Sequence, residues 1–216
     1  MSPQLDEATL ERLVNDVIHG DRTALARLFD YYRERLWRIV QFRMNKRLVG
    51  RVDADDVLQE AYLDAEKRIE HFLYDSPESF FIWLRLIVNQ TLIDVHRRHM
   101  ETQSRDVARE RPNSRGWSPE STSFSLSQHL LGEMTTPSQI ALKAELTEQL
   151  NVALEGMNDL DREVLALRHF EELTNAETAR ALGISEQAAS IRYVRAIGRL
   201  RRVLEALPGF RERTQQ

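Results

Sequence analysis

The chain has 216 residues, enough for two compact domains of about 80 to 100 residues and a connecting segment. It has no cysteine and no apolar run long enough to cross a bilayer, which excludes disulfide bonds, cysteine-ligated zinc and a membrane span. The formal net charge of −4 argues against a surface coated throughout by nucleic acid.

The charges are nevertheless segregated along the chain. Residues 33–51 carry seven basic side chains and one acid, residues 53–66 carry six acids and no base, and residues 187–202 carry five arginines and no acid. We therefore expect separate faces for separate partners. The opening stretch MSPQLDEATL lacks the basic-then-apolar order of a signal peptide, so we expect a cytoplasmic protein.

The composition predicts an all-α fold. Glycine, proline and β-branched runs are scarce, and apolar residues recur at helical spacing in residues 8–100 and 139–210. Residues 101–138 contain eight serines, three prolines and no lysine, which is typical of a linker. We expect two small helical domains, 8–100 and 139–210, joined by a flexible linker in which SFSLSQHLL is a candidate docked segment.

One helix of the first domain is expected to begin near Asp53, whose carboxylate can cap free backbone amides. Its inner face would hold Leu58, Ala61, Tyr62, Ala65, Ile69 and Phe72. Its outer face offers Asp56, Gln59 and Glu60.

A second helix follows, with Ser76 as its cap and Pro77 in its first turn. Its buried stripe is expected to consist of Phe80, Leu84, Ile87, Val88, Thr91, Leu92 and Val95.

Residues 174–202 carry a helix-turn-helix pattern. Thr174 and Glu177 have the spacing of a capping box, Gly183 permits a tight turn, and Ser185 can cap a second helix. The inner face of that helix is expected to hold Ala189, Tyr193, Ala196, Ile197 and Leu200.

The second helix of such a motif places its N-terminal residues in the major groove. Base edges would then be approached by Glu186, Gln187, Ser190 and Ile191, and phosphates by Arg192, Arg195 and Arg199. The alternative is an amphipathic helix with a solvated arginine face. The capped helix pair with its well-placed glycine favours DNA binding.

Three stretches, DADDVLQEAYLDAEKRIEHF, SFFIWLRLIVNQTLIDVHRR and LDREVLALRHFEELTNAETARALGIS, resemble in that order successive segments of bacterial sigma-70 family initiation factors. The short chain with two helical domains is similar to the extracytoplasmic-function (ECF) group. This resemblance implies a factor that binds core RNA polymerase, directs it to specific promoters and helps melt the minus-ten element. It implies that Asp56, Gln59 and Glu60 dock on the clamp coiled coil of the largest polymerase subunit.

The resemblance also implies contacts with promoter DNA, both double-stranded and locally melted. Melted bases need aromatic faces, and their backbone needs cations. For the minus-ten element the expected residues are Tyr74, Arg85, Asn89, Arg97 and Arg98, with Phe80 and Trp83 assigned to the core. For the minus-thirty-five element they are Glu186, Gln187, Ser190, Arg192, Arg195 and Arg199.

Two positions depart from the family pattern. Ala188-Ala189-Ser190 stands where many relatives carry Thr-Val-Lys, which removes a cation near the groove, and Thr178 replaces a large aliphatic residue.

The linker would let the two domains hold both promoter elements at once, and in the family it also threads the polymerase interior. No sensory domain is recognisable, so we expect control by a separate anti-sigma factor.

Two other classes of function compete with this interpretation. An enzyme could use His96 and His99, or the cluster of Asp53, Asp55 and Asp56, as metal ligands. No third ligand is evident near the histidines, helix capping explains the aspartates more simply, and no phosphate loop or nucleophile motif is present. We therefore expect neither catalysis nor a cofactor or metal. A stand-alone helix-turn-helix regulator would explain the second domain but leave the ordered motifs of the first as coincidence.

Overall fold

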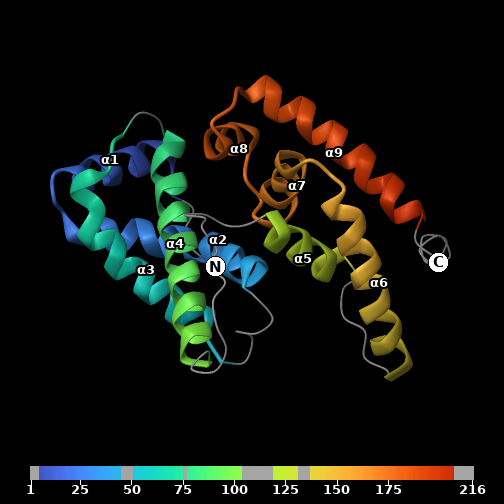
Figure 1. Ribbon diagram of the computed structural model, residues 1–216. Helices are drawn as coiled ribbons and strands as arrows, with labels where there is room; N and C mark the ends of the chain where they lie inside the picture. Colours follow the sequence, from blue (N-terminus) through green and yellow to red (C-terminus); the bar gives the residue numbers. More distant parts are fainter. Residues whose placement is uncertain (1–4, 45–50, 75–76, 104–118, 131–136, 207–216) are drawn as a thin grey trace. The chain divides into compact units, whose positions relative to one another are not determined.

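The computed structural model describes residues 5–44, 51–74, 77–103, 119–130 and 137–206. The chain divides into two compact units, residues 1–116 and 117–216. Within the described ranges every regular element is helical and no strand occurs, which confirms the predicted all-α fold (Figure 1). No helix in these ranges is both long enough and apolar enough to span a membrane.

The first unit is built from four α-helices and a short 3₁₀ turn among its described residues. The elements are α1 (Glu7–Ile18), α2 (Arg22–Arg43), α3 (Ala54–Arg68), η1 (Ile69–His71) and α4 (Pro77–Gln103). The carboxylates of Asp6, Asp21 and Asp53 cap the first three helices by accepting hydrogen bonds from backbone amides one or two residues into each helix. Sequence neighbours pack together, because α2 contacts both α1 and α3, and α4 contacts α3 and α2.

The core of this unit follows the predicted apolar stripe of α4. The predicted cap Ser76 lies outside the described residues. The side chains that are buried as expected are Phe80, Leu84, Ile87, Val88, Thr91, Leu92 and Val95. Phe72, Phe80 and Trp83 form a cluster with ring centroids 5.2 to 5.6 Å apart, so Phe80 is a core residue and the half-buried Trp83 packs at its edge.

Every regular element among the described residues of the second unit is also helical. Its elements are α5 (Pro119–Leu130), α6 (Pro137–Glu155), α7 (Asp159–Leu165), a π-helical turn η2 (Ala166–Phe170), α8 (Asn175–Leu182) and α9 (Glu186–Ala206). Arg162 joins α7 to the end of α6. Its guanidinium is 4% exposed, and its Nη1 donates to the carbonyls of Leu154, Glu155 and Met157 at 2.8 to 2.9 Å. These carbonyls lie at the end of α6, where a helix lacks backbone partners.

The segment predicted as linker contains a packed helix. Helix α5 contacts α6 and α7, with the side chains of Ser123, Leu126 and Ser127 fully buried. The hydroxyl of Thr122 donates to the Glu163 carboxylate at 3.0 Å. Serine-rich composition predicts a weak helix, but tertiary packing overrides that propensity. The second unit therefore includes residues 119–130, and the stretch SFSLSQHLL lies within it.

Candidate nucleic-acid and protein interfaces

The predicted helix-turn-helix is formed by α8 and α9. The Glu177 amide donates to Thr174 Oγ1 at 3.1 Å and the Thr174 amide donates to the Glu177 carboxylate at 2.8 Å, which is a complete capping box. Gly183 ends α8 with a φ of 63°, in the left-handed region that favours glycine. Ser185 Oγ accepts from the Ala188 amide at 3.2 Å and so begins α9 as predicted.

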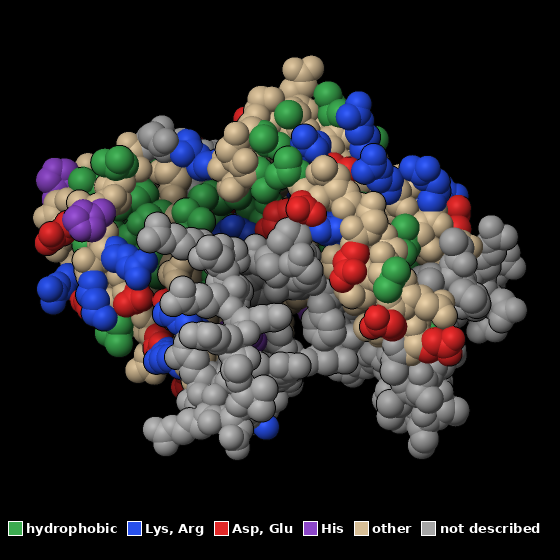
Figure 2. Space-filling view, viewed as in Figure 1, with side chains coloured by type: hydrophobic (Ala, Val, Ile, Leu, Met, Phe, Trp, Pro, Cys, Tyr) green, Lys and Arg blue, Asp and Glu red, His purple; other side chains and the backbone are tan. Residues whose placement is uncertain are grey.

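Helix α9 presents a polar, basic face along its length. Ala189, Ala196 and Leu200 are buried as expected, with Tyr193 and Ile197 partly exposed. Basic side chains gather along α9 in the space-filling view (Figure 2). Of the predicted contact residues, Arg192 is half-buried, and those exposed are Glu186, Gln187, Ser190, Arg195 and Arg199.

The arginines of α9 fall into two groups. Arg192 and Arg199 both bind Asp161 of α7, Nη1 to carboxylate oxygen, at 3.3 and 2.8 Å. The Asp161 side chain is 6% exposed. Arg195 is exposed and forms no ion pair within the described part of the chain. The three predicted phosphate contacts are therefore not equivalent.

The start of α9 is also tied to α8. Asn175 Nδ2 donates to the Glu186 carbonyl at 3.0 Å, and the Glu186 carboxylate lies 3.5 Å from the same amide. This contact fixes the end of the helix that carries the predicted base-reading residues.

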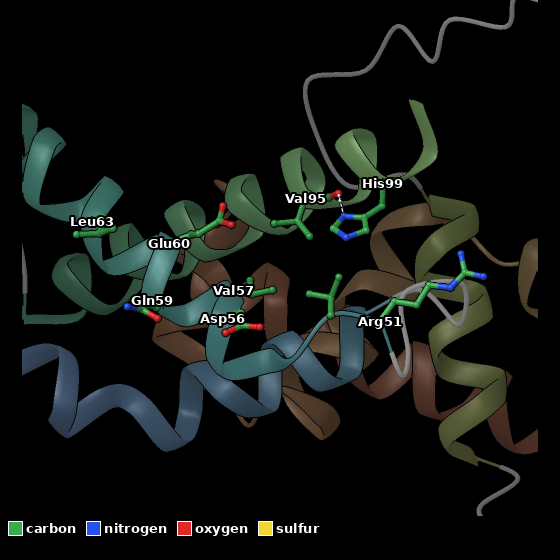
Figure 3. Close-up of a pocket in the computed structure, with 9 residues that line it drawn as sticks. Arg51, Asp56, Val57, Gln59, Glu60, Leu63, Val95 and His99 are labelled. Carbon is green, nitrogen blue, oxygen red and sulfur yellow. Dashed lines mark hydrogen bonds between the residues drawn. The ribbon is translucent and has the colours of Figure 1, made fainter. Parts of the chain in front are cut away.

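In the first unit, the predicted acidic face of α3 borders a surface pocket of about 340 Å³ (Figure 3). Asp56, Gln59 and Glu60 are all exposed on this face. The pocket combines their polar groups with apolar ones, and its other lining residues are Arg51, Val52, Val57, Leu63, Val95 and His99. Such a mixed, open hollow suits a protein partner rather than an enclosed small molecule.

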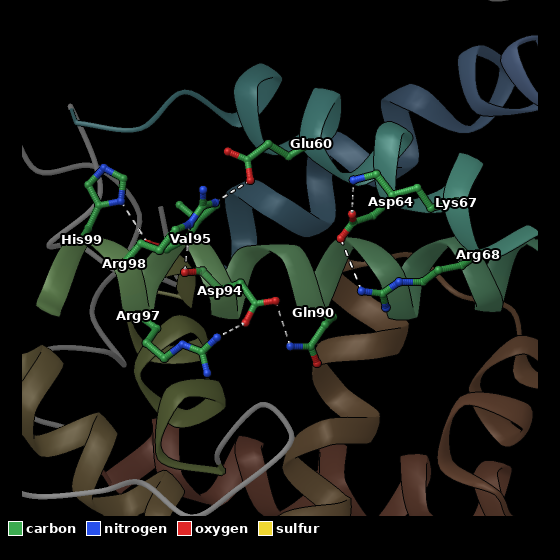
Figure 4. A network of polar contacts seen from close by, with 10 residues as sticks. All are labelled: Glu60, Asp64, Lys67, Arg68, Gln90, Asp94, Val95, Arg97, Arg98 and His99. Atoms are coloured by element: carbon green, nitrogen blue, oxygen red, sulfur yellow. Dashed lines mark hydrogen bonds and ion pairs between the residues drawn. The ribbon is translucent and has the colours of Figure 1, made fainter.

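Some acids of α3 have structural partners inside the unit. Asp53 caps the helix, and Asp55 accepts from Arg33 Nη2 at 2.7 Å, a hydrogen bond that raises the pKa of the Arg33 guanidinium. Asp64 lies 3.4 Å from both Lys67 and Arg68 (Figure 4), and Glu66 lies 3.8 Å from Arg22.

These ion pairs account for the acids beyond the first turn of α3, which helix capping alone does not explain. Asp56, in the first turn of α3, differs from the paired acids, because it has no ion pair within the described residues. No group of three or more histidine or acidic side chains in the described ranges could hold a metal ion.

The predicted minus-ten residues lie at different depths. Tyr74 is 43% exposed, whereas Arg85 is 5% exposed, so Arg85 lies in the core of the unit and its contact with DNA stays a prediction. The helical spacing placed it beside Asn89, but this part of α4 packs on both sides. Arg97 pairs with Asp94 at 3.0 Å and Arg98 pairs with Glu60 of α3 (Figure 4).

Asn89 and His99 are the other predicted polar residues of α4 whose contacts the structure describes. Asn89 is half-buried, and its Oδ1 is buried without a hydrogen-bond partner among the described residues. His99 contacts the Val95 carbonyl through Nδ1 at 3.0 Å, as a helical side chain commonly does (Figure 3).

A protein-family model described as ECF sigma factor matches residues 7–204, which is most of the chain. The chain belongs to the ECF sigma factor family. As a sigma factor it directs RNA polymerase to promoters, and the stand-alone regulator is not favoured. Members of the family are transcription initiation factors.

Known sigma factors resemble this one over most of its length. It is 27% identical to the ECF RNA polymerase sigma factor BldN of Streptomyces coelicolor, with 92% of this chain and 67% of BldN covered. It is 24% identical to the ECF RNA polymerase sigma factor SigW of Bacillus subtilis, with 93% and 100% covered. A solved structure of CnrH in complex with the cytosolic domain of CnrY has a TM-score of 0.50 at 20% identity, covers 90% of this chain and 96% of that one, and shows a shared fold.

Two residues of this sigma factor escaped sequence reasoning. Asp161 and Arg162 lie in the first turns of α7, where charged residues are usually read as solvated or dipole-compensating. Asp161 binds arginines 31 and 38 residues away, and Arg162 binds carbonyls of the preceding helix. One signal could have revealed them. Asp161 and Arg162 stand next to each other on the side of α7 that packs against the rest of the unit, where apolar residues are usual.

Proposed function

We propose that this sigma factor binds core RNA polymerase through the exposed face of α3 and holds promoter DNA through α4 and α9. The single observation that carries the DNA-binding part of this proposal is the helix pair α8–α9, with both ends of α8 and the start of α9 capped, which exposes Gln187, Ser190 and Arg195 as a groove-reading motif requires. The first unit would serve the polymerase and the minus-ten element, and the second unit the minus-thirty-five element.

Docking on the polymerase is assigned to Asp56, Gln59 and Glu60. Asp56 supports this role best, because it is exposed and carries a charge that no described side chain neutralises. The neighbouring Leu63, which is 47% exposed, supplies apolar area beside the charges. The partner surface would therefore be basic with apolar contacts, which fits the clamp coiled coil that the family resemblance implies.

Contacts with the melted minus-ten strand are assigned to Tyr74, Asn89, Arg97 and Arg98. Tyr74 offers an exposed ring for base stacking, and the two arginines offer charge for the backbone. Arg85 remains the fifth predicted contact, and with an exposure of 5% it is the least accessible of the set.

The remaining parts of the proposal concern the working protein as a whole. The predicted linker was residues 101–138, between the predicted domains 8–100 and 139–210. Because α4 extends to Gln103 and α5 begins at Pro119, residues 104–118 would supply the tether, with α5 held on the second unit. The protein would act in the cytoplasm as a non-catalytic factor without a cofactor. An anti-sigma factor would control it. CnrH, another chain of this fold, is known in complex with the cytosolic domain of CnrY.

The test is transcription from linear genomic templates by purified core polymerase with and without this chain. Promoter-specific transcripts should appear only when the chain is present. DNA binding without any change in start sites would instead support a stand-alone regulator.

The docking assignment has its own variant. Replacing Asp56 and Glu60 with lysine should lower the affinity for core polymerase at least tenfold, because two favourable charge contacts become repulsive. Glu11→Lys reverses an exposed acid on α1 of the same unit and serves as the control. Equal affinities for the double variant and the control, measured by surface plasmon resonance with circular dichroism confirming the fold, would contradict the assignment.

A further inference from the structure

Asp161 is a buried carboxylate shared by two arginines of the proposed DNA-reading helix. Its side chain is 6% exposed, while the side chains of Arg192 and Arg199 are 35% and 45% exposed. The two arginines are seven residues apart, about two helical turns, so both project from the same face of α9. One carboxylate of α7 therefore grips α9 at two points along its axis.

This arrangement restrains α9 more than apolar packing would. An apolar contact lets a helix rotate or slide by a fraction of a turn, whereas a charge-assisted hydrogen bond depends on distance and angle. Two such bonds to the two oxygens of one carboxylate fix both the rotation of α9 and its axial position. A buried carboxylate also needs its partners, since an unpaired one is strongly disfavoured.

The same contact alters the charge that α9 presents to DNA. One negative charge stands against Arg192 and Arg199, so this cluster has a net charge of one rather than two. Arg195 lies between them in the sequence and has no ion pair in the described ranges. Since each phosphate neutralised adds about 0.9 to the salt dependence of binding, a smaller net charge weakens attachment to DNA of any sequence.

We propose that Asp161 is a positioning residue for minus-thirty-five recognition, which holds α9 in its reading orientation and limits its attraction to DNA of unrelated sequence. This inference rests on the proposed function of α9. Arg199 lies 13 residues beyond Glu186, about 20 Å along the helix, so the clamp acts on the base-reading end through the helix and not by contact.

The experiment compares the full chain with its Asp161→Asn variant in holoenzyme assembled with core polymerase. Fluorescence anisotropy is measured from about 50 to 200 mM salt, the range over which phosphate contacts change affinity most. One duplex carries the minus-thirty-five element of a promoter active in the transcription assay, and the other carries the same element scrambled. Asp161→Asn should steepen the salt slope on the scrambled duplex by about 0.9. It should also lower the ratio of specific to scrambled affinity roughly tenfold, as the loss of one base-pair readout does.

Glu205→Gln is the matched control, because it likewise removes one acid that pairs with an arginine of α9. Glu205 pairs with Arg201 at 2.8 Å, with side chains 44% and 79% exposed, and this pair joins α9 only to itself. The control should change the salt slope in the same direction while leaving discrimination unchanged. If Glu205→Gln lowers discrimination as much as Asp161→Asn does, charge alone explains the effect and the positioning role is overturned.

A second pair of variants covers the case in which Asp161→Asn is not folded at the assay temperature, as judged by its thermal transition. Arg199→Gln removes one arm of the clamp and should lower discrimination, whereas Arg201→Gln should not. Equal discrimination in these two variants overturns the inference. If no promoter responds to the chain at all, the proposed function fails instead, and the scrambled duplex still reports whether Asp161 limits attraction to DNA of unrelated sequence.

Discussion

At the scale of single residues, Thr178 shows what a departure from the family pattern means physically. Its side chain is fully buried in α8, and its hydroxyl has no hydrogen-bond partner among the described residues. An unsatisfied buried hydroxyl lowers stability by about 1 to 3 kcal/mol. The polar group where relatives carry an aliphatic one is therefore a local weakness in the helix-turn-helix.

Thr178→Val should raise the free energy of unfolding of the second unit by about 1 kcal/mol, because it removes the unpaired hydroxyl at nearly constant volume. The same exchange at Thr174 should lower it by about 1 kcal/mol, because it removes the cap of α8. Urea unfolding followed by circular dichroism measures both. A shift of the same sign in the two variants would refute this explanation.

Asn89 presents a similar contrast between stability and activity. Its Oδ1 is buried without a partner in the described part of the chain, so Asn89→Ala should leave stability unchanged or slightly raised. If the side chain holds an extruded base, the variant should impair promoter melting more than closed-complex formation. Permanganate reactivity of the melted bases reports the first step, and footprinting at low temperature reports the second.

Gln90→Ala is the control for that measurement. Gln90 is the next residue of α4, is also half-buried, and donates to Asp94 at 3.2 Å. Melting that falls equally in both variants would mean that α4 was disturbed generally, and the specific role of Asn89 would be lost.

At the scale of elements, α5 is a structural part of the second unit. Leu126 is fully buried in it, and the helix contacts both α6 and α7. Leu126→Ala should lower the free energy of unfolding of the second unit by about 2 to 5 kcal/mol. Val152→Ala, at a position 59% exposed on α6, should change it by less than about 0.5 kcal/mol. Differential scanning calorimetry of the full chain distinguishes these outcomes, and similar losses in both variants would contradict the packing role of α5.

The elements also show what the sequence could and could not predict. Caps and turns such as Thr174, Gly183 and Ser185 are local patterns, and the structure has them where the sequence indicated. The Asp161 clamp joins residues more than 30 positions apart, which no local pattern encodes. The stretch SFSLSQHLL was expected as a candidate docked segment, but the extent of helix α5 was not predicted, because serine has weak helix propensity and only the surface it packs against reveals its stability.

The difference between local patterns and contacts of distant residues also explains why the exposed face of α3 was predictable and the burial of Arg85 was not. The acidic face of α3 was predictable, because one helix determines which side chains point outward. The burial of Arg85 was not, because it depends on how much of α4 its neighbours cover.

At the scale of the whole molecule, the length of chain between α4 of the first unit and α5 of the second limits how far apart the two units can bind. Fifteen residues, 104–118, separate α4 from α5 and can extend to roughly 50 Å. Deleting eight of them should lower transcription from promoters of normal spacing at least tenfold, because the remaining reach is roughly 25 Å. Replacing the same eight with glycine and serine should preserve it. Run-off transcription measures both, and equal losses would show that the sequence of this segment matters rather than its length.

The ion pair between Glu60 and Arg98 has a consequence for genetics. One partner belongs to the proposed polymerase-binding face and the other to the proposed DNA-binding face, so a substitution at either alters the electrostatic environment of both. Alleles isolated for weak polymerase association should therefore include changes at Arg98, and such alleles should carry secondary promoter-opening phenotypes. A charge-exchanged double mutant would restore the pair yet remain defective, which separates the loss of the bridge from the loss of the two surfaces.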